Sequence, residues 1–470
     1  MESFVNAIES INGKVNSFAW GPIMLLLLVG TGVFLTVKVN WLQVTHFGRI
    51  LKATIGGLFK KGEKKDAKTD GKNISAFQAV STALAGTVGT GNIAGVTGAI
   101  FTGGAGAVFW MWVAAFFGMV TKYAEIVLAM KFRVKDDEGV YHGGPMYYIE
   151  NGLGKKFKWL AVIFCILGGL ATFGIGNIAQ GNEIAGSLYD LFGLPKVWGG
   201  VVIAIIVGLV TIGGIQRISK VTSLLVPFMS VFYILAGIVI IILRITSIPA
   251  VFGTIFSQAF SFKSIGGGLF GYTIMMAMKQ GFARGVFSNE AGLGSAPIAH
   301  AASSVEEPCE QAIWGVFEVF IDTIVICSIT AFAVILSGIL DTAGGLGAFV
   351  SKGSAAAAAF NTILPGTIGG KIIQISLIFF ALSTILSWAY YGESCWRYLT
   401  NNSKVVIWIY KILFIGVCIV GAVGSGTLMW DIADTLNGLM AIPNLIALLL
   451  LSGTVTKLTK DYFADHMLKK

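Results

Sequence analysis

The sequence predicts an all-α polytopic membrane protein with about eleven transmembrane helices. Composition is the first observation behind this fold class: of 470 residues, 55% are hydrophobic and 12% are charged, whereas soluble domains carry about 25% charged residues. The second is the abundance of glycine, 61 residues, which is typical of closely packed membrane helices. Together they exclude an ordinary soluble enzyme and predict a single polytopic unit.

A helix needs about 20 mostly apolar residues to cross a bilayer, and this length identifies the segments. The residues before the first span are expected to form a short amphipathic segment rather than a signal peptide, because they include Glu2, Glu9 and Lys14. The predicted spans are residues 20–39, 76–100, 106–130, 158–190, 197–214, 221–243, 266–295, 311–337, 371–397, 404–424 and 430–452.

The net charge of +9 comes from cations that lie between the apolar segments, which favours a membrane topology over nucleic-acid binding. Lys and Arg concentrate in alternate loops, and the positive-inside rule assigns those loops to the cytoplasm. The N-terminus is therefore expected outside and the C-terminus inside. The lysine-rich stretch 60–72 is interpreted as a solvated loop that fixes topology, with an anionic-lipid patch as the alternative. Residues 142–154 are expected to form a structured or re-entrant loop.

Two predicted spans are rich in glycine where a continuous helix is unfavourable. Span 76–100 contains AGTVGTGN at residues 85–92. Span 266–295 begins with three glycines at 266–268 and continues with QGFARG at 280–285. Each glycine costs about 1 kcal/mol in a helix interior, so we expect both spans to be unwound there. Close helix packing through small residues is the alternative.

Ten spans follow the first, and they divide into two sets of five with opposite orientation, so a repeated unit would be inverted. An unwound membrane segment is tolerated only where it is buried in protein or lines a polar cavity. Its half-helix ends offer N–H groups to an anion and carbonyls to a cation. Paired interruptions of this kind are typical of binding sites in secondary transporters, and an amino acid carries both charges.

Several polar residues lie inside predicted spans, where an isolated charge costs at least about 2.5 kcal/mol. Lys122 and Glu125 are three residues apart on one helix and are expected to neutralise each other. Gln180 offers a donor and an acceptor to a bound amino acid, with an interhelical hydrogen bond as the alternative. Ser383 and Thr384 offer hard oxygen ligands, although such hydroxyls usually bond a carbonyl one turn back.

Several long strings of the sequence carry a resemblance. They are GTVGTGNIAGVTGAI at 86–100, GGAGAVFWMW at 103–112, TKYAE at 121–125, GGPMYYIENGLG at 143–154 and GFARGVFSNEAGLGSAP at 281–297. These strings resemble the alanine or glycine:cation symporter family, which is similar to the leucine-transporter fold. The resemblance implies an N-terminal helix before an inverted repeat of five plus five helices, two of them discontinuous.

On this resemblance the chain divides into five parts. They are an N-terminal segment with the first span and a basic cytoplasmic loop (1–75), a first repeat (76–243), an extracellular connection (244–265), a second repeat (266–452) and a cytoplasmic tail (453–470).

The resemblance also implies a substrate site. Backbone N–H groups of the first unwound segment would hold the substrate carboxylate, and a carbonyl there would accept from the ammonium group. Bulky Trp and Phe side chains would limit the substrate side chain to hydrogen or methyl. The implied residues are Thr90 and Gly91 for the carboxylate, Thr87 for the ammonium group, Gln180 from the third core helix, Thr384 and Trp388 for the pocket wall, and Phe282 for its closure.

A sodium site is implied beside it. The carbonyls of Ala85 and Val88 and the hydroxyls of Ser383 and Thr384 resemble the shared site between the first and eighth core helices. Asn92 stands where leucine-transporter relatives use an asparagine at a second sodium site. The resemblance implies sodium-driven uptake of alanine and glycine across the plasma membrane by alternating access. Na⁺ is the coupling ion, with no organic cofactor, no nucleic acid and no obligate protein partner expected.

Three other functions compete with this one. A proton-coupled carrier of the same substrates would use Glu125 or Glu183 as the titrating group. A channel would need a continuous polar path, whereas the polar groups here gather around two interrupted segments. An intramembrane enzyme would need a nucleophile or a metal motif such as H-E-x-x-H, and none of the four histidines lies deep in a predicted span, so no enzymatic activity is expected.

Overall fold

The computed structural model describes residues 2–59, 72–260, 270–342, 349, 351–424 and 426–468, and nearly all regular structure in them is helical. The all-α prediction is therefore confirmed. Two predictions lie outside the described residues: the unwinding at 266–268, and residues 60–71 of the lysine-rich stretch.

Each predicted span overlaps one or more of the described helices, and further short helices lie between the spans. In the first half these are α1 (Glu2–Ala19), α2 (Pro22–Lys38), α3 (Leu42–Thr45), α4 (Phe47–Phe59), α5 (Ala76–Thr87), η1 (Gly91–Gly95), α6 (Val96–Gly103), α7 (Gly106–Lys131), α8 (Pro145–Leu153), η2 (Lys155–Phe157), α9 (Lys158–Phe173), η3 (Gly174–Ile178), α10 (Ala179–Phe192), α11 (Lys196–Thr211) and α12 (Gly214–Leu243). The second half contains η4 (Ile245–Ser247), α13 (Ile248–Ala259), α14 (Phe270–Asn289), α15 (Ala296–Ala301), α16 (Pro308–Val319), η5 (Phe320–Cys327), α17 (Ser328–Leu336), α18 (Ile339–Thr342), α19 (Lys352–Ile363), α20 (Ile368–Leu399), α21 (Lys404–Val423), α22 (Gly426–Leu450) and α23 (Ser452–Leu468).

Within the described ranges, eight helices are long and apolar enough to cross a bilayer, or nine if a bent pair counts as one span. The bent pair is α5 with η1 and α6. Lys196–Thr211 and Ile245–Ala259 are shorter apolar helices. A multi-pass membrane protein is thus confirmed, while the number eleven, the inverted repeat and the five-part division stay predictions.

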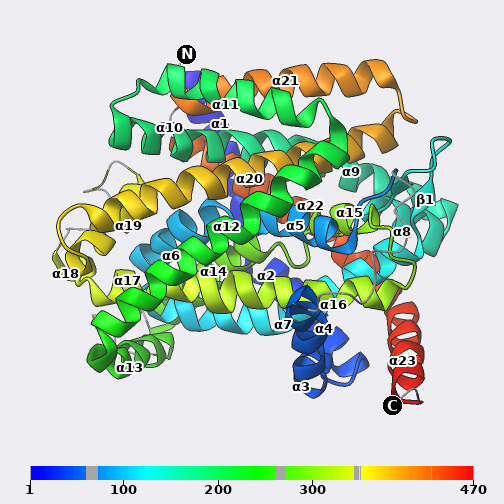
Figure 1. The fold of residues 1–470 in the computed structure, drawn as a ribbon, viewed down its shortest axis with the longest axis horizontal. Coiled ribbons are helices and arrows are strands. Elements are labelled where there is room, and N and C mark those ends of the chain that lie inside the picture. Colours follow the sequence, from blue (N-terminus) through cyan, green and yellow to red (C-terminus); the bar gives the residue numbers. More distant parts are fainter. Residues whose placement is uncertain are drawn as a thin grey trace.

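Two long helices organise the packing. α7 packs against α2, α13, α14, α15 and α16, and α20 packs against α5, α9, α10, α12 and α19. Figure 1 shows α20 crossing the middle of the molecule and α7 along its lower side, with α3, α4 and α23 projecting from one edge. The helix α5 contacts α15 and α20, and η1 contacts α14 and α19. The first broken span therefore lies between the two groups of helices.

The first predicted interruption is confirmed. Helix α5 begins with a capping box, in which Ser75 Oγ accepts from Gln78 N at 3.2 Å and Gln78 Oε1 accepts from Ser75 N at 3.0 Å. It ends at Thr87, and the chain bends by 43° before the π-helical turn η1 continues into α6. The glycines at 86, 89 and 91 remove the side chains that would oppose this close passage.

The part of the second predicted interruption that lies in the described residues, 280–285, is wrong. Helix α14 continues through residues 280–285, where the glycines serve close packing instead. A Cβ on Gly281 would lie 2.5 Å from the Ala107 carbonyl oxygen, and one on Gly285 would lie 3.2 Å from Ala114 Cβ. The chain breaks later, between α14 and α15, where Glu290 has a φ of 58°. Gly292 and Gly294 follow with φ of 93° and 79°.

The loop at 142–154 is structured, as predicted. The strands β1 (Val134–Lys135) and β2 (Tyr141–His142) pair in antiparallel register, and α8 follows directly. His142 Nε2 and Asp136 Oδ2 lie 2.8 Å apart across the hairpin. In this way the segment forms a compact unit against the end of α9.

Candidate functional site

The first break is shaped by its own asparagine. Asn92 Oδ1 accepts from Gly89 N at 2.8 Å, and Asn92 N donates to the Gly89 carbonyl at 3.2 Å. These reciprocal bonds hold residues 89–92 in a tight turn instead of a continued α-helix. All of this occurs in the buried interior, where an unpaired backbone group would be costly.

Gln180 reaches the same break from α10. Thr90 N donates to Gln180 Oε1 at 3.4 Å, and Gln180 Nε2 donates to the Ile175 carbonyl at 3.0 Å in η3. The structure therefore places Gln180 beside the backbone amide that the sequence assigned to the substrate carboxylate. Thr87 and Thr90 are buried next to it, and within the described chain the Thr90 hydroxyl has no hydrogen-bond partner.

Three of the four predicted sodium ligands converge. Thr384 Oγ1 donates to the Ala85 carbonyl at 3.1 Å, and Ser383 Oγ lies 3.4 Å from the same oxygen. Both hydroxyls also bond the Phe380 carbonyl one turn back, at 3.0 and 2.8 Å, as the alternative interpretation expected. Val88 is buried in the break itself, with φ −78° and ψ 90°. Carbonyl and hydroxyl oxygens from a broken helix suit a sodium ion.

Gly89 of the first break passes close to α20. A Cβ on Gly89 would lie 2.4 Å from Thr384 Oγ1, so only glycine fits there without a shift. One turn further along α20, Trp388 is also buried, and its Nε1 donates to Glu290 Oε1 at 2.8 Å. The same face of α20 thus contacts both interrupted segments.

Phe282 and Phe287 of α14 lie in different surroundings. Phe282 packs against Trp110, with ring centroids 5.7 Å apart, and lines a small cavity with side chains of α2 and α7. Phe287 lies against the first break, because a Cβ on Gly91 would be 3.1 Å from Phe287 Cδ1. The aromatic ring next to Gly91 is therefore Phe287, which the sequence did not single out.

A polar cluster around Asp322 was also not assigned a role from the sequence. Asn92 Nδ2 donates to Asp322 Oδ1 at 2.6 Å, while Ser288 Oγ and Thr323 Oγ1 both donate to Oδ2 at 2.8 Å. Asn92 therefore presents its NH₂ group to this cluster and its oxygen to Gly89. The second sodium site that the resemblance implied at Asn92 stays a prediction. The signal in the sequence was an acidic residue inside a predicted span.

The second break is held by Glu125 of α7. Glu125 Oε1 accepts from Gly292 N at 3.1 Å, from Gly294 N at 3.0 Å and from Asn444 Nδ2 at 2.5 Å. The expected pairing with Lys122 is not what holds this carboxylate. Lys122 Nζ instead donates to the Asn289 carbonyl at 2.7 Å and lies 3.5 Å from Glu318 Oε2. Lys122 and Glu125 are thus each bonded to groups on other segments.

An ion pair between α14 and α22 lies next to the Phe287 ring. Arg284 of α14 donates to Asp434 of α22 from Nη1 and Nη2, with Nη1 to Oδ1 at 3.0 Å. The guanidinium carbon of Arg284 lies 5.3 Å from the centroid of the Phe287 ring. Thr90, Gln180 and Trp388 below are at most 1% exposed. The structure therefore describes these residues closed off from solvent.

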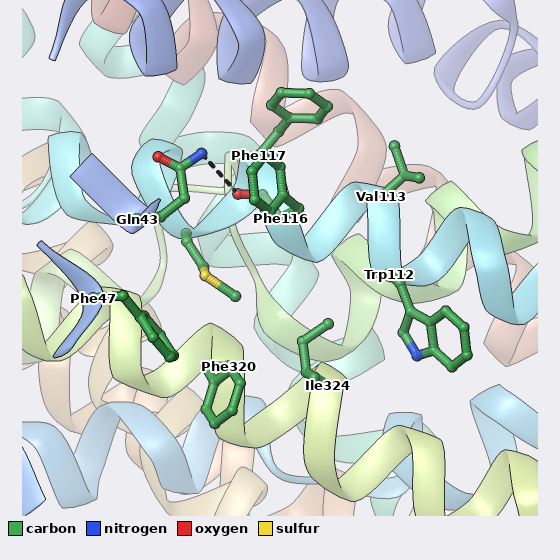
Figure 2. A pocket seen from close by; sticks show the side chains of 9 residues that line it. Gln43, Phe47, Trp112, Val113, Phe116, Phe117, Phe320 and Ile324 are labelled. Carbon is green, nitrogen blue, oxygen red and sulfur yellow. Dashed lines mark hydrogen bonds between the residues drawn. The ribbon is translucent and has the colours of Figure 1, made fainter. Parts of the chain in front are cut away.

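A cavity of about 430 Å³ lies elsewhere, between α3, α4, α7 and η5. Figure 2 shows it surrounded by aromatic and aliphatic side chains, with Gln43 at one end bonded to the Phe116 carbonyl. A cavity with such an apolar lining does not suit a zwitterionic amino acid. It is lined by Gln43, Phe47, Trp112, Val113, Phe116, Phe117, Met119, Phe320 and Ile324.

Comparison with known proteins shows the family of the chain. The model of the sodium:alanine symporter family matches residues 5–470. The chain is 49% identical to the sodium/alanine symporter AgcS of Methanococcus maripaludis over 96% of this chain and 97% of the relative. It is 38% identical to a putative sodium/proton-dependent alanine carrier, YrbD, of Bacillus subtilis, over 96% of this chain and 91% of the relative.

A solved structure shares the fold. It is that of a Na⁺-coupled sialic acid symporter, with a TM-score of 0.54 and 16% sequence identity over 92% of this chain and 87% of the other. The family match over residues 5–470 and the 49% identity to a sodium/alanine symporter show to which family the chain belongs. The chain therefore belongs to the sodium:alanine symporter family and is a transporter, not an enzyme.

Proposed function

We propose that this protein couples sodium entry to the uptake of small neutral amino acids, alanine and glycine, across the plasma membrane. The N-terminus lies outside and the C-terminus in the cytoplasm. The observation that carries the proposal is the convergence of the Ser383 and Thr384 hydroxyls on the Ala85 carbonyl, beside the unwound segment. It supports a cation site that is built into the same turn as the substrate site.

Sodium binds first in this mechanism. It is held by the carbonyls of Ala85 and Val88 and by the hydroxyls of Ser383 and Thr384. Because Thr384 lies against Gly89, the bound ion fixes the shape of the turn that follows. The backbone amides of that turn are then preorganised for a carboxylate, which lowers the entropic cost of substrate binding.

The amino acid binds beside the ion. Its carboxylate accepts from the N–H groups of Thr90 and Gly91, and its ammonium group donates to the Thr87 carbonyl. Gln180 Oε1, which accepts from Thr90 N in the described state, exchanges this bond for one to the substrate. Trp388 borders the substrate side chain, and Phe287 closes the pocket in the role that the sequence gave to Phe282.

Transport then proceeds by alternating access around this site. Opening toward the outside requires that the Arg284–Asp434 ion pair separates, since it joins α14 to α22 over Phe287. Sodium and amino acid leave together on the cytoplasmic side. No covalent step is involved, and the energy comes from the sodium gradient.

A proton-coupled carrier of the same substrates is the second candidate. It is favoured by the similarity to a putative sodium/proton-dependent alanine carrier and by two buried carboxylates. Glu125 holds the second break, and Glu183 Oε2 lies 3.5 Å from Ser351 Oγ. A coupling proton on either group would make alanine uptake follow pH without sodium.

Alanine binding to the purified protein tests the proposed coupling. Titration calorimetry is performed in sodium, and in choline at the same ionic strength and pH. Coupling between two ligands is reciprocal, so sodium must tighten alanine binding by the same factor by which alanine tightens sodium binding. Equal alanine affinity in the two salts would contradict the sodium-coupled mechanism, and an affinity that changes only with pH would favour the proton-coupled one.

A further inference from the structure

Glu290 is an unusual residue for the start of the second break. It has a left-handed backbone, with a φ of 58°, which non-glycine residues adopt only at an energetic cost. Its carboxyl group is buried at the same time, with 1% of the residue exposed. Glycine would meet the backbone requirement without burying a carboxyl group. The side chain must therefore contribute something that the turn alone does not need.

The carboxyl group joins two segments. Glu290 Oε1 accepts from Trp388 Nε1 at 2.8 Å, and Oε2 accepts from Ser295 Oγ at 2.7 Å. Trp388 belongs to α20, whereas Ser295 ends the break that Glu290 begins. Each oxygen therefore has its own fixed donor, and the indole is tied to the second break.

The indole of Trp388 is fixed on its other sides by packing. A Cβ on Gly176 would lie 2.4 Å from Trp388 Cβ, so η3 passes directly against the root of the side chain. Tyr391 meets the ring edge to face at a centroid distance of 5.6 Å. Packing confines the ring position, and the hydrogen bond to Glu290 is directional and selects its orientation.

The orientation of the indole affects the proposed substrate site, because Thr384 lies one turn away on α20. Thr384 is on the same face of α20, against Gly89 and bonded to the Ala85 carbonyl. A rotation of the indole would change the space beside the unwound segment. That space is where the proposed function places the substrate side chain, so the inference rests on that function.

We infer that Glu290 is a positioning residue that fixes the Trp388 indole and thereby sets the largest amino-acid side chain that the site accepts. The carboxyl group does not touch the substrate. It acts through the indole, so its loss changes the preference among substrates rather than only the rate.

The test compares alanine with 2-aminobutyrate, which is larger by one methylene, and measures kcat/KM for uptake into proteoliposomes. Glu290→Met keeps the length of the side chain and removes the acceptor. One methylene in an apolar pocket is worth about tenfold or more in discrimination, and we expect Glu290→Met to lose about that factor. Glu290→Gln keeps an acceptor oxygen for the indole and is expected to retain the wild-type ratio.

Trp388→Phe removes the donor of the same hydrogen bond. It keeps the inference testable if a Glu290 variant does not fold. It is expected to relax the ratio as Glu290→Met does, and the double variant is expected to add nothing further. If Glu290→Met slows the uptake of both substrates equally, Glu290 has only a structural role and the inference is wrong. If Trp388→Phe relaxes the ratio and Glu290→Met does not, the indole is not positioned by Glu290.

The two proposals fail in different ways. A wild-type protein that shows no sodium-dependent alanine uptake contradicts the proposed function. Normal sodium-dependent alanine uptake with an unchanged substrate ratio in Glu290→Met and Trp388→Phe contradicts the roles of Glu290 and Trp388 in side-chain selection and leaves the sodium-coupled uptake standing.

Discussion

Gln180 connects α10 to the backbone of the first break, through Thr90 N at 3.4 Å. Gln180→Ala removes the acceptor and a donor for the bound amino acid. Loss of such a buried partner costs about 1–3 kcal/mol, so the Kd for alanine is expected to rise by about 5- to 150-fold. Binding is measured by calorimetry in saturating sodium.

Gln374→Ala is the matched control for Gln180. Gln374 is also a buried glutamine, but its Nε2 donates to Asp190 Oδ2 at 2.8 Å, away from the break. It is expected to leave the alanine affinity unchanged. A Gln180→Ala protein that binds alanine as the wild type does would remove Gln180 from the substrate site.

The hydroxyls of Ser383 and Thr384 carry the proposed sodium coupling. The double variant Ser383→Ala/Thr384→Ala removes two of the ligands, so the sodium concentration for half-maximal uptake is expected to rise by about tenfold or more, equivalent to about 1.4 kcal/mol. Ser394→Ala is the control, because its hydroxyl bonds only the Tyr390 carbonyl, at 2.9 Å, among the described contacts. Normal sodium activation in the double variant would place the ion elsewhere.

At the scale of single elements, the two breaks differ in how well the sequence predicted them. Residues 85–92 place glycines in an otherwise apolar span, and the chain is unwound there. Residues 280–285 show the same pattern, but Gly281 and Gly285 allow α14 to pack against α7. Glycine content alone does not separate unwinding from close packing, because both need a missing side chain. The glycine pattern did not indicate that the chain would break at Glu290, which has a positive φ.

The spacing of charged residues was also insufficient to predict their partners. The spacing of Lys122 and Glu125 predicted a pair within one helix, yet Lys122 binds Asn289 and lies near Glu318. Glu125 binds the amides of the second break. Spacing reports which side chains share a helix face, whereas the partners offered by other helices depend on the tertiary fold.

The second break depends on Glu125 for its shape. Glu125→Ala leaves the buried amides of Gly292 and Gly294 without their acceptor, and each lost bond costs about 1–3 kcal/mol. We expect a clearly lower melting temperature in detergent, measured by thermal shift. Glu125→Gln keeps an acceptor oxygen and is expected to lose less stability and to retain sodium-driven uptake.

The exposed Glu138 provides the control for this experiment, and Glu138→Ala is expected to melt as the wild type does. A Glu125→Ala protein with unchanged thermal stability would contradict the structural role of Glu125. Loss of uptake in Glu125→Gln without loss of stability would instead support a coupling proton on this group.

At the scale of the whole molecule, composition was sufficient for the fold class. A chain with 12% charged residues cannot cover itself with polar side chains, so the helices of the apolar segments have to lie in a membrane. Composition alone did not predict the site. Gln180 is far in sequence from Thr384 and Trp388, and the two segments come together only because α10 and α20 pack against each other. Phe287 was not singled out because nothing local distinguishes an aromatic side chain that faces a break. Asp322 was recognisable only as an acidic residue inside a predicted span, which does not say what it contacts.

Uptake of radiolabelled L-alanine into proteoliposomes tests the central claim most directly. An inward sodium gradient is compared with potassium or choline gradients at matched pH, and with a proton gradient in the absence of sodium. The sodium-coupled mechanism predicts accumulation above equilibrium only with the sodium gradient. Accumulation driven by the proton gradient alone, or no alanine accumulation under any gradient, would contradict it.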